Sequence, residues 1–337
     1  MCYNKLNCII YGGTFMRGRR KIGVLTSGGD APGMNAAIRA VVRVGVESGL
    51  EIFGVRRGFN GLLTSDIICM NLRSVSDIID LGGTILYTAR SKEFATKEGI
   101  ALARDNCKKL GLDGLIIIGG DGSLRGAREL SEAGVFCVGI PGTIDNDVNC
   151  SEYAIGFDTA MNTAMRMIDK IRDTAKSHER CSIVEVMGRN CGEIALQTGI
   201  SVGATAIIVP EVFYDFKKDI INRIKVTQKK GKKYFIVIVS EGIGKINDIA
   251  EQIYMETGIE TRTTVLGHVQ RGGSPTLRDR VVASKMGAKA IEIICKGTLP
   301  RIIAMKSEKI IDCDINQDCI KKEFDLDLYN TALKISI

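Results

Sequence analysis

The stretch that decides the fold is LIIIGGDGS (Leu115–Ser123), where a run of large aliphatic residues ends abruptly in glycines. Four consecutive aliphatic residues are typical of a β-strand that is covered on both faces. The glycines predict a tight turn, and the amphipathic pattern of Ser123–Ala133 predicts a helix directly after it. A strand that leads through such a turn into a helix is the repeating unit of α/β proteins with a mainly parallel sheet.

The same alternation continues along the chain, which has 337 residues and is long enough for two domains. Helical patterns occupy Met34–Glu47, Thr159–Lys176 and Arg278–Lys296. We therefore expect an α/β fold in which right-handed crossovers join parallel strands. The other runs that predict strands are Ile22–Leu25, Glu51–Val55, Val135–Ile140, Ser182–Val186, Ala206–Val209 and Tyr234–Val239.

Composition narrows the class of protein. Apolar residues make up 45% of the chain and charged residues 25%, which is the balance of a soluble globular protein. No apolar run has the length of a membrane helix, and the N-terminus lacks the charge order of a secretory signal, so we expect a cytoplasmic protein. The 11 scattered cysteines and 2 histidines do not predict a disulfide framework or a zinc site.

The net charge of +7 favours an anionic small molecule as the ligand. The basic residues are dispersed, there is no tryptophan, and aromatic residues make up only 5% of the chain. A surface that binds nucleic acid by stacking needs basic and aromatic residues gathered in one place. A solvated basic surface would give the same net charge.

The turns after the predicted strands carry the candidate chemistry, because ligands of parallel α/β folds bind at the carboxyl ends of the strands. In the turn Gly119–Ser123, open backbone amides suit phosphate oxygens, and Asp121 supplies the oxygen that Mg²⁺ prefers. Asp121 could also simply cap the helix. The turn Thr26–Asn35 is rich in glycine too, but its spacing matches neither the dinucleotide fingerprint nor the P-loop.

A third turn, Pro141–Asp147, contains two carboxylates two residues apart. In an extended segment Asp145 and Asp147 would point the same way and could meet on one ligand. A carboxylate that accepts a hydroxyl proton is the usual base of kinase chemistry. Asp and Asn also favour ordinary turns, so this segment taken alone fits either interpretation.

Arg90, Arg189 and Arg271 each follow glycines near the end of a predicted strand or turn. Arginine presents a rigid fork of donors that matches phosphate oxygens, so the three together favour anion binding. One such arginine alone would be read as solvated surface. His268, which lies beside Arg271, is a candidate substrate contact, whereas His178 in a polar segment is expected to be surface.

Taken together, these segments closely resemble bacterial-type ATP-dependent 6-phosphofructokinase from about Lys21 to about Ile315. The resemblance implies the phosphofructokinase fold, with two similar domains that each contain a mainly parallel sheet flanked by helices. It implies an ATP-binding domain of residues 21–156 plus about 270–320, and a sugar-phosphate-binding domain of about 157–269 plus 321–337. Residues 1–20 have no counterpart in the family.

The implied reaction is transfer of the γ-phosphoryl group of ATP to the 1-hydroxyl of fructose 6-phosphate, with Mg²⁺ as cofactor. Asp145 matches the base, and Thr143, Arg189 and Arg90 match its catalytic partners. The matching ATP-site residues are Gly29, Arg90, Ser91, Gly120, Asp121, Gly122 and Ser123, with Asp121 facing the metal. The matching substrate contacts are Thr143, Asp145, Asp147, Arg180, Met187, Gly188, Arg189, Glu241, Arg262, His268 and Arg271.

The resemblance also implies a homotetramer, since Arg180 and Arg262 match arginines that reach the sugar's phosphate from a neighbouring subunit. Arg39, Arg43, Arg172, Lys230 and Lys232 match an effector site for ADP or phosphoenolpyruvate. This chain departs from the pattern there. Leu72 stands where arginine is usual (Arg73 is adjacent), Thr205 where a metal-binding glutamate is usual, and Tyr234 where histidine is common. We therefore expect weak or altered control by these effectors.

Two positions bear on the phosphoryl donor. Relatives that use pyrophosphate carry aspartate where this chain has Gly122 and lysine where it has Gly142. Both glycines indicate ATP, because an acidic side chain at position 122 would crowd and repel the α-phosphate. The alternatives are a pyrophosphate-dependent enzyme, a lipid or NAD kinase with a similar glycine turn, and an inactive sugar-phosphate-binding regulatory subunit. An intact set of Asp121, Asp145 and Arg189 argues against the last of these.

Overall fold

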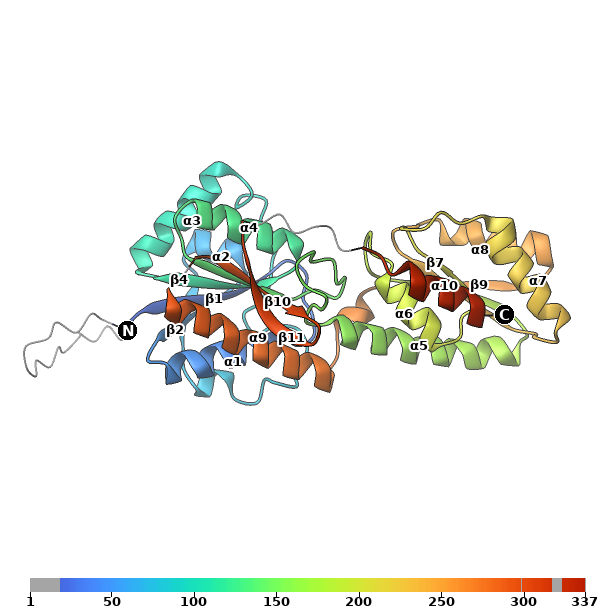
Figure 1. The fold of residues 1–337 in the computed structure, drawn as a ribbon, viewed down its shortest axis with the longest axis horizontal. Coiled ribbons are helices and arrows are strands. Elements are labelled where there is room, and N and C mark those ends of the chain that lie inside the picture. The colour runs from blue at the N-terminus through green and yellow to red at the C-terminus, as the bar shows by residue number, and fades with distance from the viewer. Residues whose placement is uncertain (1–18, 298, 317–322, 337) are drawn as a thin grey trace, which may run out of the picture.

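The computed structural model describes residues 19–297, 299–316 and 323–336. Of the unmatched segment 1–20, therefore, only Arg19 and Arg20 lie within the described residues. The described residues form two sheets side by side, each covered by helices (Figure 1). None of the helices in these residues is both long and apolar enough to cross a membrane.

The larger sheet has seven strands in the order β11-β10-β5-β4-β1-β2-β3. The five inner strands run parallel, and the edge strands β3 and β11 pair antiparallel with their neighbours. The strands are β1 (Lys21–Ser27), β2 (Glu51–Val55), β3 (Ile67–Met70), β4 (Gly114–Gly119), β5 (Cys137–Pro141), β10 (Arg301–Lys306) and β11 (Lys309–Asp314).

Helices cover both faces of this sheet, which explains the unbroken aliphatic run of β4. Ile116 and Ile118 pack into one core with α1 and α9, while Leu115 and Ile117 pack into another beneath α2, α3 and α4 (Figure 1). Alternate side chains of a strand point to opposite faces, so both faces must be apolar. The helices are α1 (Met34–Glu47), α2 (Phe59–Thr64), α3 (Lys97–Leu110), α4 (Asp121–Glu132) and α9 (Leu277–Lys296), with the short η1 (Arg73–Val75) beside β3.

The smaller sheet has four parallel strands in the order β7-β8-β6-β9. The long helix α5 begins at the larger sheet and runs along the smaller one (Figure 1). The strands are β6 (Cys181–Val186), β7 (Ala206–Ile208), β8 (Phe235–Ser240) and β9 (Thr261–Val265). The helices are α5 (Phe157–Ser177), α6 (Glu193–Ser201), α7 (Asn222–Lys229), α8 (Ile246–Thr257) and α10 (Leu326–Ile335), with η2 (Phe216–Ile221) and η3 (Gly267–Arg271).

A buried carboxylate fixes the start of α5 against α9. Asp279, in the first turn of α9, is fully buried. It accepts hydrogen bonds from the Tyr153 hydroxyl at 2.6 Å and from the amides of Gly156 at 2.8 Å and Thr159 at 2.9 Å, as well as from the Thr159 hydroxyl. A carboxylate on the first amides of a helix satisfies donors that have no partner within the helix. Asp279 therefore holds α5 in place beside the turn that contains Asp145.

Candidate active site

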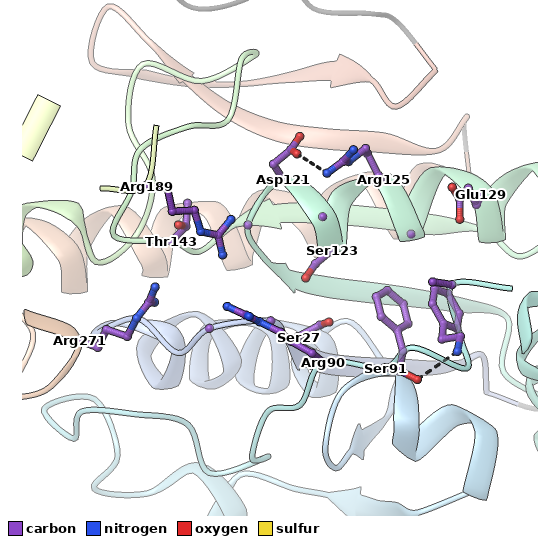
Figure 2. Close-up of a pocket in the computed structure, with 18 residues that line it drawn as sticks. Ser27, Arg90, Ser91, Asp121, Ser123, Arg125, Glu129, Thr143, Arg189 and Arg271 are labelled. Carbon is purple, nitrogen blue, oxygen red and sulfur yellow. Dashed lines mark hydrogen bonds and ion pairs between the residues drawn. The ribbon is translucent and has the colours of Figure 1, made fainter. Parts of the chain in front are cut away.

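A cavity of about 350 Å³ lies at the carboxyl ends of β1, β4 and β5. It brings together residues from widely separated turns (Figure 2). The sequence-predicted site residues that line it are Gly29, Arg90, Ser91, Gly120, Asp121, Gly122, Ser123, Thr143, Arg189 and Arg271.

The turn between β4 and α4 forms one wall of the cavity. A Cβ atom at Gly119 would lie 2.6 Å from the carbonyl oxygen of Ser27, so only glycine lets the ends of β4 and β1 approach this closely. A Cβ atom at Gly122 would have nothing within 4 Å. Helix α4 begins at Asp121 and has no side-chain cap at Gly120. The positive end of the helix dipole is therefore available to an anion at the cavity wall.

Asp121 stands at this helix start and forms an ion pair with Arg125, one helical turn further on, at 2.9 Å. Both side chains are substantially exposed, at 67% for Arg125 and 44% for Asp121, and both line the cavity (Figure 2). Asp121 also lines a second cavity of about 380 Å³ together with Asp147 and Arg189. It is therefore accessible from both cavities.

The turn Pro141–Asp147 brings its two carboxylates to one arginine. Arg189 places Nε at 3.1 Å from Oδ2 of Asp145 and Nη1 at 3.8 Å from Oδ2 of Asp147. The sequence predicted that Asp145 and Asp147 meet on one ligand, but the extended backbone from which this was predicted is wrong. The segment is not extended, because Asn146 has a left-handed backbone with φ of 52°. The Asn146 side chain holds this turn through hydrogen bonds with Glu152, Ala154 and Glu193.

The electrostatic setting of Asp145 suits a proton acceptor. The side chain is 1% exposed, and neither carboxylate oxygen has an aligned hydrogen-bond partner. Burial, and then the charge of Asp147, raises the pKa of Asp145, whereas the charges of Arg189 and Arg271 oppose this rise. Burial also raises the pKa of Asp147. A buried carboxylate with a raised pKa is a stronger base than an exposed one.

Glu241 positions Arg189 through the backbone. Its Oε1 accepts hydrogen bonds from the amides of Gly188 at 3.1 Å and Arg189 at 2.5 Å. Gly188 and Arg189 have φ values of 140° and 53°, so this turn after β6 has an uncommon backbone that the two bonds help to maintain. Met187 lies within the same turn, and its amide donates to Gln270 at 3.3 Å. The predicted substrate contacts Met187, Gly188 and Glu241 therefore lie next to Arg189 but do not line either cavity.

The segment after β9 contributes Arg271 but not His268. Arg271 Nη1 donates to the carbonyl of Asp30 at 3.0 Å, and the guanidinium lies against Gly29, where a Cβ atom would be 2.6 Å from Nη1. His268 is exposed and lines neither of the two cavities. The structure thus joins Arg271 to the nucleotide-side turns and leaves His268 on the surface of this chain.

Arg180 and Arg262 lie away from the cavity. Arg180 immediately precedes β6, whereas Arg189 follows it, and a strand of this length spans about 20 Å. Both arginines are bound to Glu260, Arg180 at 2.8 Å and Arg262 at 2.7 Å. Within one chain they do not meet the other candidate substrate contacts.

The candidate effector residues fall into two groups. Arg39 and Arg43 lie on α1 over the larger sheet. Arg172, Lys230 and Lys232 lie at the smaller sheet, where a cavity of about 270 Å³ is lined by the two lysines. Lys232 Nζ donates to the hydroxyl of Thr205 at 3.2 Å, and burial, with the charge of Arg172, lowers the Lys232 pKa. The two groups do not form one site within this chain.

The residues at the cavity fit Mg²⁺ only in company with a phosphate ligand. The described part of the chain has no group of three or more His, Cys, Asp and Glu side chains arranged to hold a metal. Mg²⁺ commonly takes one or two protein carboxylates and completes its shell with water and phosphate. Asp121 on the cavity wall suits that habit, and Oδ1 of Asp145 and of Asp147, which lack a hydrogen bond, leave more acceptors close by.

Several cavity residues were missed by sequence reasoning. Phe59 and Phe94 stack with ring centroids 3.8 Å apart and line the cavity. They come from different segments, so no local pattern joins them. Glu129 lies at the opposite end of the cavity from Arg271 (Figure 2). Arg125 lies on the predicted helix Ser123–Ala133, but Asp121 precedes that prediction, so their pairing one turn apart emerged only when the structure placed the helix start at Asp121.

The site combines a glycine turn at a helix start, a carboxylate beside it and an arginine paired with a buried aspartate. In a parallel α/β protein this combination is typical of a phosphoryl-transfer site. The profile of the phosphofructokinase family matches residues 21–294, and the chain belongs to that family. It is 54% identical to an ATP-dependent 6-phosphofructokinase of Clostridium tetani over 318 residues, which cover 94% of this chain and 99% of that protein. It is 53% identical to that of Clostridium botulinum over the same length.

Solved structures confirm the expected fold. Phosphofructokinase from Saccharomyces cerevisiae matches with a TM-score of 0.82 and 34% identity, covering 94% of this chain. The chain spans 46% of the length of that yeast chain. A pyrophosphate-dependent phosphofructokinase from Nitrosospira multiformis matches with a TM-score of 0.81 and 21% identity, over 95% of this chain and 92% of that one. This second likeness concerns the fold alone.

Proposed function

We propose that this chain transfers the γ-phosphoryl group of ATP to the 1-hydroxyl of fructose 6-phosphate, which gives fructose 1,6-bisphosphate and ADP. The observation that carries the proposal is the position of Arg189. It lines the cavity that contains the glycine turn and Asp121, and it forms an ion pair with the buried Asp145. The nucleotide-side and base-side groups therefore meet at one guanidinium. The high identity to ATP-dependent relatives supports the same conclusion.

In this mechanism Asp145 accepts the proton of the attacking hydroxyl. Its burial and raised pKa support that role. The amide of Asp145 donates to the Thr143 hydroxyl at 3.2 Å, so Thr143 helps to fix the turn and presents its oxygen at the cavity. Arg189 leaves the carboxylates for the transferring phosphoryl group and offsets the charge that develops on it. Arg90 and Arg271 line the same cavity and add positive charge.

The remaining assignments follow the family pattern. Asp121 would hold Mg²⁺, which supplies charge neutralisation for the phosphates when bound. Gly29, Ser91, Gly120, Gly122 and Ser123 would surround the nucleotide, and the cavity they line supports this assignment. Met187, Gly188, Glu241 and His268 would contact the sugar. We place residues 21–156 plus about 270–320 in the ATP-binding domain and about 157–269 plus 321–337 in the sugar-phosphate-binding domain, and we place the enzyme in the cytoplasm.

We assign Arg180 and Arg262 to the sugar phosphate of a neighbouring subunit in a homotetramer. Their position at the far end of β6 and β9 from Arg189 supports this assignment, because one chain cannot bring them to its own base. A mixture of two variants, Arg180→Ala and Asp145→Asn, tests it. Hybrid tetramers should regain activity that neither variant has. Absence of any regain in verified hybrids would contradict a shared site.

ATP rather than pyrophosphate is the proposed donor. Gly122 lines the cavity and a Cβ atom there would have nothing within 4 Å, so the absence of a side chain leaves this volume to the nucleotide. At Gly142 a Cβ atom would already lie 3.0 Å from Ile118 and 3.3 Å from Met34, so a lysine there would need a different packing of these residues. Both positions in this chain suit ATP.

We also propose weak or altered control by ADP and phosphoenolpyruvate. Thr205 offers a hydroxyl that already accepts from Lys232, and it cannot replace a carboxylate as a ligand of a metal-bound effector. Rate measurements against fructose 6-phosphate concentration, with and without ADP, test this. The expected curve changes little with ADP. A strongly sigmoidal curve that ADP relieves would contradict the proposal.

The acceptor is tested by supplying MgATP with fructose 6-phosphate, glucose 6-phosphate or unphosphorylated fructose. Coupling to aldolase reports fructose 1,6-bisphosphate and distinguishes it from ATP hydrolysis. Product should form only with fructose 6-phosphate. If the purified chain binds this sugar phosphate but never turns it over, the inactive regulatory subunit is the better assignment.

A further inference from the structure

The ion pair between Asp121 and Arg125 lies inside the proposed nucleotide cavity and has no part in the mechanism above. Arg125 Nη2 is 2.9 Å from Oδ2 of Asp121. Figure 2 shows the two side chains reaching toward each other across the first turn of α4. The proposed metal ligand is therefore already paired with a cation in this structure.

Such a pair is easily opened. Arg125 and Asp121 are four residues apart on one helix and are 67% and 44% exposed. Exposed pairs of this kind change an equilibrium by about two- to fivefold. A divalent cation that arrives with the phosphates of a nucleotide competes for the same carboxylate with twice the charge and directly bound oxygen ligands. The pair is strong enough to bias the empty site and weak enough to be displaced.

The neighbours of Asp121 make its charge important. The cavity must accept a polyanion at the start of α4, beside Gly120 and Gly122, where a bare carboxylate would repel phosphate oxygens. An arginine on the carboxylate removes that repulsion when no metal is present. A metal that bound Asp121 would first have to displace the guanidinium of Arg125 from this carboxylate.

We propose that Arg125 is a positioning residue that neutralises Asp121 in the empty site and gives up this carboxylate to the metal that arrives with the nucleotide. In this way Arg125 sets how strongly the site prefers metal-bound over metal-free nucleotide. This inference rests on the proposed function, since it takes Asp121 as the metal ligand. Without Arg125, metal-free nucleotide meets a bare carboxylate, whereas metal-bound nucleotide no longer has to break an ion pair. Both effects raise the preference for the metal-bound form.

The test is calorimetric titration of the whole protein with ADP, once in excess Mg²⁺ and once in excess EDTA. The quantity of interest is the ratio of the dissociation constant without metal to that with metal. Bound Mg²⁺ removes two negative charges from the ligand, so loss of the Arg125 charge acts unequally on the two titrations. In Arg125→Met we expect the ratio to rise about three- to tenfold, and Arg125→Lys should return most of the way to the original ratio.

Arg104→Met is the matched control. Arg104 pairs with Asp105 at the same distance of 2.9 Å, but it lies on α3 and lines neither cavity, so its removal should leave the ratio unchanged. Because Arg125 is largely exposed, its variant should fold normally, and circular dichroism checks this. A ratio in Arg125→Met that stays within twofold of the original, or falls, overturns the proposal.

Asp121→Asn separates this inference from the proposed function. If the original protein binds MgADP and Asp121→Asn loses the preference for metal, the nucleotide site stands whatever Arg125 does. If that result comes with no change in Arg125→Met, only the role of Arg125 fails. If the original protein binds ADP neither with nor without Mg²⁺, both are overturned.

Discussion

Replacing Asp145 with asparagine removes the proposed base while keeping the size of the side chain. General base catalysis contributes about 10²- to 10⁴-fold, so we expect kcat to fall by about 10³, which corresponds to about 4 kcal/mol in the activation free energy. Dissociation constants for fructose 6-phosphate should stay within about threefold, because the amide occupies the same volume. A coupled rate assay gives kcat, and calorimetry gives the binding constant.

The fold should tolerate this change. Asp145 is 1% exposed, and its two carboxylate oxygens lack aligned hydrogen-bond partners. Its ion pair with Arg189 joins a buried carboxylate to a guanidinium that is 48% exposed, so the attraction lost on substitution is set against a large desolvation cost. Removing a buried charge offsets that loss, so the free energy of unfolding should be unchanged or raised by about 1 kcal/mol. A melting curve of Asp145→Asn then distinguishes loss of the base from loss of the fold.

The matched control is Asp147→Asn, since Asp147 faces the same arginine at 3.8 Å and its pKa is also raised by burial. Its kcat should fall at least tenfold less than that of Asp145→Asn. A near-normal rate in Asp145→Asn, together with a large loss in Asp147→Asn, would refute the assignment and make Asp147 the base.

Three further outcomes are expected. Gly122→Asp should raise the KM for ATP by at least tenfold, because the carboxylate would face the phosphates. The free energy of unfolding should not change, because nothing lies within 4 Å of a Cβ atom there. An unchanged KM would show that position 122 does not set the donor. The acid limb of kcat/KM against pH should lie above pH 3.8, because the pKa of Asp145 is raised and the base is therefore protonated early as the pH falls. In the same pH window protonation relieves the cost of the buried charge, so the free energy of unfolding should rise as the pH falls. An acid limb at or below pH 3.8 would contradict this. Asp279→Ala should lower the free energy of unfolding by about 3–5 kcal/mol in a denaturant titration, because buried donors from Tyr153, Gly156 and Thr159 lose their acceptor. A loss under about 1 kcal/mol would show that water replaces the carboxylate as the acceptor.

Strands β1, β2, β4 and β5 and the phosphate-side turns could be predicted from the sequence because each is a local signal. The run at Leu115–Ile118 is aliphatic because both faces are covered, and the predicted helix Met34–Glu47 coincides with α1. The hairpin of the inner strand β10 and the edge strand β11 was not predicted. Its turn, Ser307–Glu308, has φ values of 48° and 62° without a glycine or asparagine, so the usual hairpin signal is absent.

The site was predictable to the extent that its residues follow strands. Asp121 and Asp145 follow the neighbouring parallel strands β4 and β5, whose carboxyl ends meet at one edge of the larger sheet, whereas Arg189 follows β6 of the smaller sheet and only the packing of the two sheets brings it to them. What sequence could not supply is side-chain geometry. The left-handed backbone of Asn146, rather than an extended one, turns the two carboxylates toward Arg189. Asp279 gave no signal at all, because its partners lie more than a hundred residues earlier in the chain.

The most direct test of the account is the initial rate of fructose 1,6-bisphosphate formation by the purified chain, with MgATP and with magnesium pyrophosphate as alternative donors. The open space at Gly122 and the glycine turn at the start of α4 predict turnover with ATP and less than about a hundredth of that rate with pyrophosphate. Turnover with pyrophosphate and none with ATP would contradict the account.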